Sequence, residues 1–313
     1  MSTRFSVEVP LGQVGRTLSE VVRSALPAGS SWNQARELCK RGKVRLNGAL
    51  ASDAAARLAA GDRIEIDLHA PRRREHTLDD GALIYFDADV VVVNKPAGLL
   101  SVPFENDDKN TLIDRVRALL RHKTGVVRAE LGAVQRLDKD TTGLMVFTRT
   151  LAAKRQLQQL FRKHDIERRY LALAHGVVKE QRIETQLLAD RGDGLRGSYG
   201  HFRRPRGPVP QDAQHAVTEL RPLAALRGAT LVECRLETGR QHQIRIHLSE
   251  QGNPLLGERV YARHYKQAMI DAPRPMLHAA VLGFSHPRNG RPLHFELPPP
   301  DDFSAAQLAL SEG

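Results

Sequence analysis

The sequence predicts an α+β protein in two parts: a small N-terminal α/β domain, and a larger domain built on a mixed, mostly antiparallel β-sheet with flanking helices. After residue 82, strand-length apolar runs outnumber helical stretches, and the two do not alternate one for one as in a doubly wound parallel sheet. A charged segment that begins with proline, residues 71–80, has no apolar periodicity and indicates a linker. We therefore expect domains at 1–70 and 83–313, joined by residues 71–82.

The N-terminal part begins with two predicted helices. Apolar residues recur at i, i+3, i+4 and i+7 over 18–25, which is the spacing of an amphipathic helix. After a break, Ser31 or Asn33 is expected to cap a second helix that ends at Gly42. Period-two alternation on either side of an Asn-Gly turn then predicts short strands at 43–48 and 62–67. This part is expected to be a compact module with one basic helix.

The larger part contains short runs rich in β-branched and aromatic residues, bounded by turn formers, which are typical of strands. These runs are 83–86, 90–93, 144–147, 170–173 and 230–234. Helical spacing of leucines and other apolar residues predicts two helices among them, over 111–121 and 151–164. Strands dominate, so a sheet is expected to form the body of this domain.

Composition limits the class of function. The chain has 313 residues with 47 Lys and Arg against 36 Asp and Glu, a formal charge of +11, which favours a polyanionic partner such as nucleic acid. No apolar run approaches the roughly 18 residues that a membrane span needs, and no secretory leader pattern is present. Cys39 and Cys234 form no CxxC pair, which suits a reducing compartment. We expect a soluble, cytoplasmic protein that is not associated with a membrane.

Two apparent ligand motifs lack the context that they need. Gly192–Gly197 matches GxGxxG, but no strand precedes it and several prolines follow, so a dinucleotide site is not expected. Residues 191–210 are better interpreted as a basic loop, either solvated or placed over phosphates. His242 and His247 are five residues apart, which does not put two metal ligands on one helical face. No metal and no cofactor are predicted.

The segment from Gln135 to Phe147 is the most unusual stretch, because a charged turn with two carboxylates directly precedes an apolar strand. Asp138 and Asp140 have cations beside them, which favours an ionised carboxylate that acts as a nucleophile or general base. An ordinary Asp-rich β-turn is the alternative. Farther along, residues 238–248 alternate polar and apolar side chains and predict a strand with Arg245 and His247 on one face and Ile244 and Ile246 on the other.

Five ordered motifs resemble the RluA-type pseudouridine synthases, over roughly residues 83–298. The charged turn, Arg136-Leu-Asp-Lys-Asp-Thr-Thr-Gly, is similar to the catalytic turn of that family. The other four matching segments begin at Val93, Arg168, Thr238 and Leu277. The N-terminal part is similar to a small RNA-binding domain named after a ribosomal protein and often fused to these enzymes. Gln135 departs from the histidine that the family usually has before the arginine of the turn.

The resemblance implies a role for each matching residue. Asp138 would be the catalytic nucleophile or base, Tyr170 would stack on the target uracil, and Arg245 would pair with the aspartate and keep it ionised. Arg136 would fill the space that the flipped uridine leaves in the RNA stem. Further substrate contacts are expected from Leu137, Ile244 and Lys95. Isomerising a uridine requires no redox change and no group transfer, so one carboxylate suffices and no cofactor is implied.

The expected partner is RNA, with ribosomal RNA of the large subunit preferred over transfer RNA, and the protein is expected to be a monomer. The N-terminal module would contact RNA through its basic residues, Arg36, Lys40, Arg41, Lys43 and Arg45. Two other functions stay open at this point. One is a non-catalytic RNA-binding or ribosome-assembly factor. The other is a glycoside or nucleoside hydrolase that uses Asp138 and Asp140 as a carboxylate pair.

Overall fold

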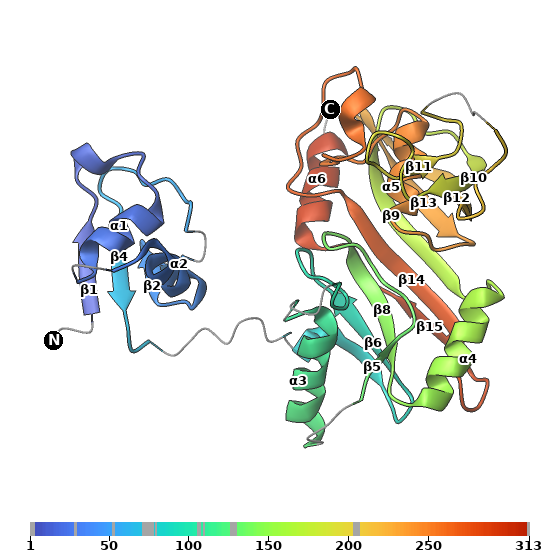
Figure 1. Ribbon diagram of the computed structural model, residues 1–313, viewed down its shortest axis with the longest axis horizontal. Helices are drawn as coiled ribbons and strands as arrows, with labels where there is room; N and C mark the ends of the chain where they lie inside the picture. The colour runs from blue at the N-terminus through green and yellow to red at the C-terminus, as the bar shows by residue number, and fades with distance from the viewer. Residues whose placement is uncertain are drawn as a thin grey trace. The chain divides into compact units, whose positions relative to one another are not determined.

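In the computed structural model the chain divides into two compact units, residues 1–77 and 78–313 (Figure 1). The structure describes residues 4–27, 30–51, 54–70, 78, 80–104, 108, 110–125, 130–202 and 207–311. Most of the expected linker, residues 71–77 and 79, lies outside the described residues. Leu78 and Ala82, which were also expected in the linker, are instead buried in the core of the second unit, because each is an apolar side chain that packs there.

Over its described residues, the first unit is a four-stranded antiparallel sheet with two helices. Its sheet has the order β1-β4-β2-β3. The strands are β1 (Arg4–Glu8), β2 (Val44–Leu46), β3 (Ala49–Leu50) and β4 (Arg63–Asp67). The helices are α1 (Leu18–Ala25) and α2 (Trp32–Lys40), with a short 3₁₀ turn, η1, at Leu11–Gln13. Both predicted helices are confirmed, and Ser31 caps the second one by accepting a hydrogen bond from the backbone N–H of Gln34.

The second unit is built on an eleven-stranded sheet, counted over the described residues. Nine strands follow the order β11-β10-β12-β13-β9-β14-β8-β6-β5, while β15 pairs with β14 and β7 with β8. The strands are β5 (Leu83–Phe86), β6 (Val90–Lys95), β7 (Gly132–Ala133), β8 (Thr142–Thr148), β9 (Glu167–His175), β10 (Gln181–Leu188), β11 (Gly197–Ser198), β12 (Gln214–Leu226), β13 (Ala229–Leu236), β14 (Leu277–Ser285) and β15 (Pro292–Glu296). The pairs are antiparallel apart from β14 with β8. The predicted α+β class with a mixed, mostly antiparallel sheet is confirmed.

Helices cover both faces of this sheet near β6 and β8. These two helices are α3 (Leu112–Thr124) and α4 (Leu151–Arg162). The helices α5 (Gln243–Glu250) and α6 (Asp301–Ser311) contact β12 instead, and two 3₁₀ turns are η2 (Asp80–Ala82) and η3 (Ala262–His264). Val91 and Val93 pack in one core cluster with α3, whereas Val90 and Val92 pack in another with Leu157 of α4. Since both faces are buried, these strands are apolar at every position instead of alternating.

The strand predicted over residues 238–248 is wrong, because residues 243–250 form the helix α5. The six residues from Gln243 to Leu248 are all buried, whatever their polarity, so the alternation of polar and apolar residues in the sequence does not separate an exposed face from a buried one. The polar side chains of α5 are buried because each has partners. Gln243, for example, donates its amide to the carbonyl of Val217 and the hydroxyl of Thr218.

Strand pairing brings distant segments to one place. Ala279 of β14 is paired with Tyr170 on one side and with Gly143 on the other, so the turn before β8 lies two strands from Tyr170 at the same level of the sheet. Gly143 has φ +113°, and a Cβ there would lie 2.3 Å from the carbonyl oxygen of Ala279. Only glycine allows this close approach of β8 and β14, which fixes where the charged turn stands relative to β9.

Candidate active site

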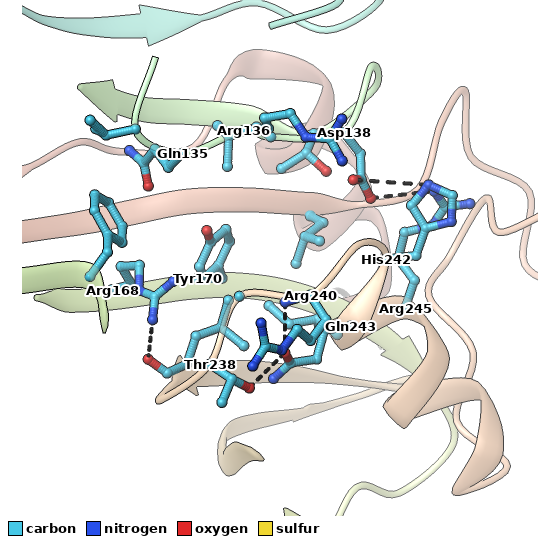
Figure 2. Close-up of a pocket in the computed structure, with 18 of the residues that line it drawn as sticks. Gln135, Arg136, Asp138, Arg168, Tyr170, Thr238, Arg240, His242, Gln243 and Arg245 are labelled. Atoms are coloured by element: carbon cyan, nitrogen blue, oxygen red, sulfur yellow. Dashed lines mark hydrogen bonds and ion pairs between the residues drawn. The ribbon is translucent and has the colours of Figure 1, made fainter. Parts of the chain in front are cut away.

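A cavity of about 370 Å³ lies where the charged turn, β9 and the segment before α5 meet (Figure 2). Its lining residues come from 134–141, from the end of α4 and from β9, and also from 236–245 and Leu277. Asp138, Tyr170 and Arg245, which are far apart in sequence, all line it. Arg136, Leu137 and Ile244 line it as well. Six of the seven side chains that were expected to act on or contact the substrate therefore line the same cavity.

Arg245 lies between two carboxylates. Its Nε and Nη2 donate to the two oxygens of Glu258 at 2.7 and 2.9 Å, and its Nη1 lies 3.4 Å from Oδ2 of Asp138. Burial works to lower the pKa of Arg245, but the hydrogen bonds and charge of Glu258 outweigh it and raise the pKa. Glu258 therefore orients the guanidinium from inside the protein, while Nη1 is left for Asp138, whose side chain is 24% exposed toward the cavity.

Glu258 was not identified from the sequence. Its side chain is fully buried, and its Oε1 also accepts hydrogen bonds from the backbone N–H groups of Val260 and Tyr261. Burial alone would raise the pKa of Glu258, but the pairing with Arg245 and these N–H donors lower it. No motif of the sequence set this residue apart; its one signal is a charged residue directly after the apolar Leu255-Leu256-Gly257 run.

His242 faces the other carboxylate oxygen of Asp138. It precedes α5 with φ +60°, its Nε2 lies 4.0 Å from Oδ1 of Asp138, and its Nδ1 is 2.6 Å from the hydroxyl of Tyr261. Burial lowers the pKa of His242, although the charge of Asp138 acts in the opposite direction. The centroid of the Tyr261 ring lies 5.3 Å from the guanidinium carbon of Arg245, which is stacked over it. Asp138 is thus flanked by a permanent cation and by a largely neutral imidazole.

Tyr170 lies on β9 with its ring in the cavity wall. It is 7% exposed, and burial, together with the nearby charge of Asp138, raises its pKa, so the phenol is neutral near pH 7. A neutral aromatic ring in the wall of a polar cavity is suited to stack on a planar base. Arg136 is exposed at the rim of the cavity, whereas Leu137 and Ile244 are buried apolar parts of its wall.

Lys95 is not placed where the sequence suggested. Its side chain is fully buried and does not line the cavity. Instead its Nζ donates to the carbonyls of Pro96, Lys139 and Thr141 at 2.7 to 3.0 Å, beneath the turn that carries Asp138. Burial lowers the pKa of Lys95 to about 7, while the charges of Asp140 and Asp138 act to raise it. The expectation of a substrate contact is therefore corrected: a buried ammonium needs acceptors, and Lys95 finds them in the turn's backbone.

The basic residues expected to bind RNA in the first unit differ in exposure. Arg36, Arg41 and Arg45 are exposed, and Arg41 pairs with Glu37 at 3.0 Å while Arg45 donates to the carbonyl of Gly48 at 2.7 Å. Lys43 is half-buried and donates to the carbonyls of Leu68 and Ala70. The side chain of Lys40 lies outside the described residues.

His247 is a structural residue of α5. Its ring nitrogens each lie 2.9 Å from a threonine hydroxyl, of Thr185 and Thr218, and burial lowers its pKa to about 4. Between about pH 6.5 and pH 4 this imidazole binds a proton in the unfolded chain but not in the folded one. The free energy of unfolding therefore falls as pH falls through this range, and this group alone accounts for about 3 kcal/mol of the decrease. In urea titrations from pH 7.5 to 4.5, the free energy of unfolding of His247→Gln should decrease less with falling pH than that of the wild type. His122→Gln, an exposed position on α3, should leave this decrease unchanged, and an unaltered slope in His247→Gln would contradict the assignment.

Metal-type ligands meet once among the described residues, at Asp87, Asp89 and His286. Burial would raise the pKa of Asp87, but hydrogen bonds from Tyr85, His286 and backbone N–H groups lower it to about 2. Asp89 pairs with Arg288 at 2.6 Å. These carboxylates already have protein partners and stand outside the cavity, so the group is a hydrogen-bonded corner of the sheet.

The glycine pattern at 192–197 follows β10, so the expectation that no strand precedes it is wrong, and its last glycine begins β11. The pattern leads into a strand and not into a helix, so the strand-to-helix frame of a dinucleotide site is missing from these described residues. The basic loop over 191–210 contains this pattern. In it Arg191 pairs with Asp193 at 3.1 Å, and residues 203–206 lie outside the described residues. Within the described ranges, no helix is both long and apolar enough to cross a membrane.

Comparisons with known proteins show which families this chain resembles. Residues 89–250 match the family model described as RNA pseudouridylate synthase, and residues 17–64 match that of the S4 domain. The chain is 38% identical to the ribosomal large subunit pseudouridine synthase D of Zymomonas mobilis, over 82% of this chain and 81% of the relative. It is 33% identical to the protein of the same name from Vibrio cholerae, over 96% of this chain and 93% of the relative. A solved structure, human RNA pseudouridylate synthase domain containing 4, aligns with a TM-score of 0.58 and 25% identity, over 73% of this chain and 92% of that one.

Proposed function

Because this chain belongs to the RNA pseudouridylate synthase family and carries an S4 domain, we propose that it isomerises specific uridines of large-subunit ribosomal RNA to pseudouridine. The observation that carries the site assignment is the meeting of Asp138, Tyr170 and Arg245 in one cavity. The choice of large-subunit RNA follows the names of the relatives that the chain covers over most of their length.

The reaction breaks the bond from C1′ of the ribose to N1 of uracil and forms a bond from C1′ to C5. The hydrogen on C5 leaves and N1 gains a proton, so atoms and electrons balance without an outside reagent. In this proposal Asp138 acts on the sugar, either by attack or by removing a proton from it. Arg245 holds the carboxylate at 3.4 Å, and Glu258 fixes the guanidinium behind it.

The target base must leave its stack to reach a cavity of this size. Tyr170 would then stack on the detached uracil, and Leu137 and Ile244 would exclude water from the intermediate. Arg136, which is exposed at the rim, would enter the space that the base vacates in the stem. The exposed arginines of the first unit would add affinity that depends on salt but not on sequence. We place the protein in the cytoplasm as a monomer.

The direct test uses transcripts tritiated at C5 of uridine, since only bond formation at C5 releases tritium to water. We expect release from large-subunit ribosomal RNA to level off at a small whole number per molecule, with no free uracil. Release from transfer RNA alone would move the substrate to that class. Binding of RNA with no release from any RNA would favour the assembly-factor hypothesis, and free uracil would favour a hydrolase.

A further inference from the structure

The cavity continues past Tyr170, away from Asp138, to a region that the proposed chemistry does not use. Figure 2 shows Gln135 and Arg168 on this side of Tyr170, and Phe161 also lines the cavity. Arg168 and Tyr170 are two residues apart on β9 and both are buried on its cavity face, so their Cα atoms are about 7 Å apart. One nucleotide spans such a distance between its base and its phosphate.

Arg168 is a buried cation that has no counter-ion among the described residues. It is 7% exposed, and within the described part of the chain no carboxylate lies within ion-pair distance of it. Its Nη2 donates to the carbonyls of Leu236 and Glu237 at 3.3 and 2.8 Å, but its Nε is buried and has no acceptor in the part of the chain that the structure describes. Burial of a charge with no opposite charge is costly, and burial accordingly lowers the pKa of Arg168. An anion that enters the cavity would remove this cost.

A second donor in the same cavity is also unsatisfied. The amide Nε2 of Gln135 is buried and has no hydrogen-bond partner among the described residues. Both free donors are N–H groups, so the group that satisfies them must offer acceptor oxygens or nitrogens. Unsatisfied buried donors are rare in folded proteins, and two in one cavity indicate a ligand that supplies the acceptors.

The guanidinium of Arg168 is held in a prepared position. A Cβ at residue 239 would lie 2.5 Å from its Nη1, so Gly239 provides the space that it occupies. On another side, the ring of Phe161 lies 5.5 Å from its Cζ. The planar group is thus fixed by contacts and by two carbonyls before any ligand arrives, which lowers the entropy lost on binding.

The charge of the cavity selects an anion. Among the described residues, its lining includes the arginines at 136, 162, 168, 240 and 245 but a single carboxylate, Asp138, which already faces Arg245. We propose that Arg168 and Gln135 form a subsite for one backbone phosphate of the RNA, directly 5′ or 3′ of the target uridine. This inference rests on the proposed function. It adds the site at which the protein binds the RNA backbone next to the flipped base.

The test uses a short stem–loop of large-subunit ribosomal RNA that the wild-type protein binds and that contains a candidate target uridine. In a series of such RNAs, one phosphate at a time near the target is replaced by an uncharged methylphosphonate. For the wild type, we expect one linkage to raise both KM and the dissociation constant about tenfold, and its position identifies the 5′ or the 3′ phosphate. Arg168→Gln should raise KM and the dissociation constant by a similar factor for the RNA with all phosphates intact. The methylphosphonate at that linkage should then cause no further increase in this variant.

Two more variants separate binding from folding. Gly239→Ala keeps the charge of Arg168 but displaces its guanidinium, so it should show the same loss of sensitivity to that linkage. Arg155→Gln removes an exposed charge on α4 that does not line the cavity, and should respond to every linkage as the wild type does. If Arg168→Gln and Gly239→Ala keep the wild-type sensitivity at every linkage, the subsite is overturned. Absence of tritium release by the wild type would instead refute the proposed function, while the dissociation constants would still decide the subsite.

Discussion

Asp138→Asn will abolish pseudouridine formation, with a fall in the rate of tritium release by about 10⁴-fold or more. Asparagine has almost the same shape as aspartate but is neither a nucleophile for the sugar nor a base. It keeps a hydrogen-bond acceptor for Nη1 of Arg245, so the fold and the cavity should be retained. RNA binding should be unchanged or slightly tighter, because the substitution removes a negative charge from a cavity lined by five arginines.

The control is Asp140→Asn, two residues along the same turn. The side chain of Asp140 does not line the cavity, so this variant should keep most of the wild-type activity. Equal losses in the two variants would support the paired-carboxylate mechanism of a hydrolase and count against a single catalytic acid. Activity in Asp138→Asn close to that of the wild type would remove Asp138 from the reaction.

Glu258→Gln is expected to destabilise the second unit strongly. Glu258 is fully buried and neutralises Arg245 through two hydrogen bonds. A glutamine turns one of its two oxygens into a donor and leaves the buried guanidinium with Asp138 alone, at 3.4 Å. Removing one partner of a buried ion pair costs about 3 to 5 kcal/mol, which should appear in the free energy of unfolding measured with urea. Folded enzyme should also have a lower kcat, because Arg245 is no longer oriented toward Asp138.

The matched control is Glu219→Gln, which breaks an ion pair with Arg235 at 3.8 Å on the exposed part of the sheet. An exposed pair of this kind contributes at most about 1 kcal/mol, so stability and kcat should hardly change. A similar small effect in Glu258→Gln would show that Arg245 does not depend on Glu258, and the account of how the site is oriented would be wrong.

Local patterns were sufficient where a segment's neighbours agree with its own preference. The helices α1 to α4 and the apolar strands β5, β6 and β8 were predicted because spacing, caps and β-branched runs all indicate one structure. Prediction failed at α5, since burial on all sides removes the amphipathic signal. It failed at Lys95 for a related reason: a lysine in a turn motif is expected at the surface, and the three carbonyls that hold it come from segments up to 46 residues away.

The sequence by itself determined the fold class and the family, and it predicted the three residues that share the cavity, because these depend on short motifs whose residue types have few other uses. The tertiary structure alone decided that Glu258 and Tyr261 support Arg245 and His242, that Lys95 lies under the turn, and that Arg168 is buried with a free donor. Such relations depend on which side chains the sheet brings together and on which charges are left without partners. Neither follows from residue types along the chain, since both are set by contacts between segments that only folding places side by side.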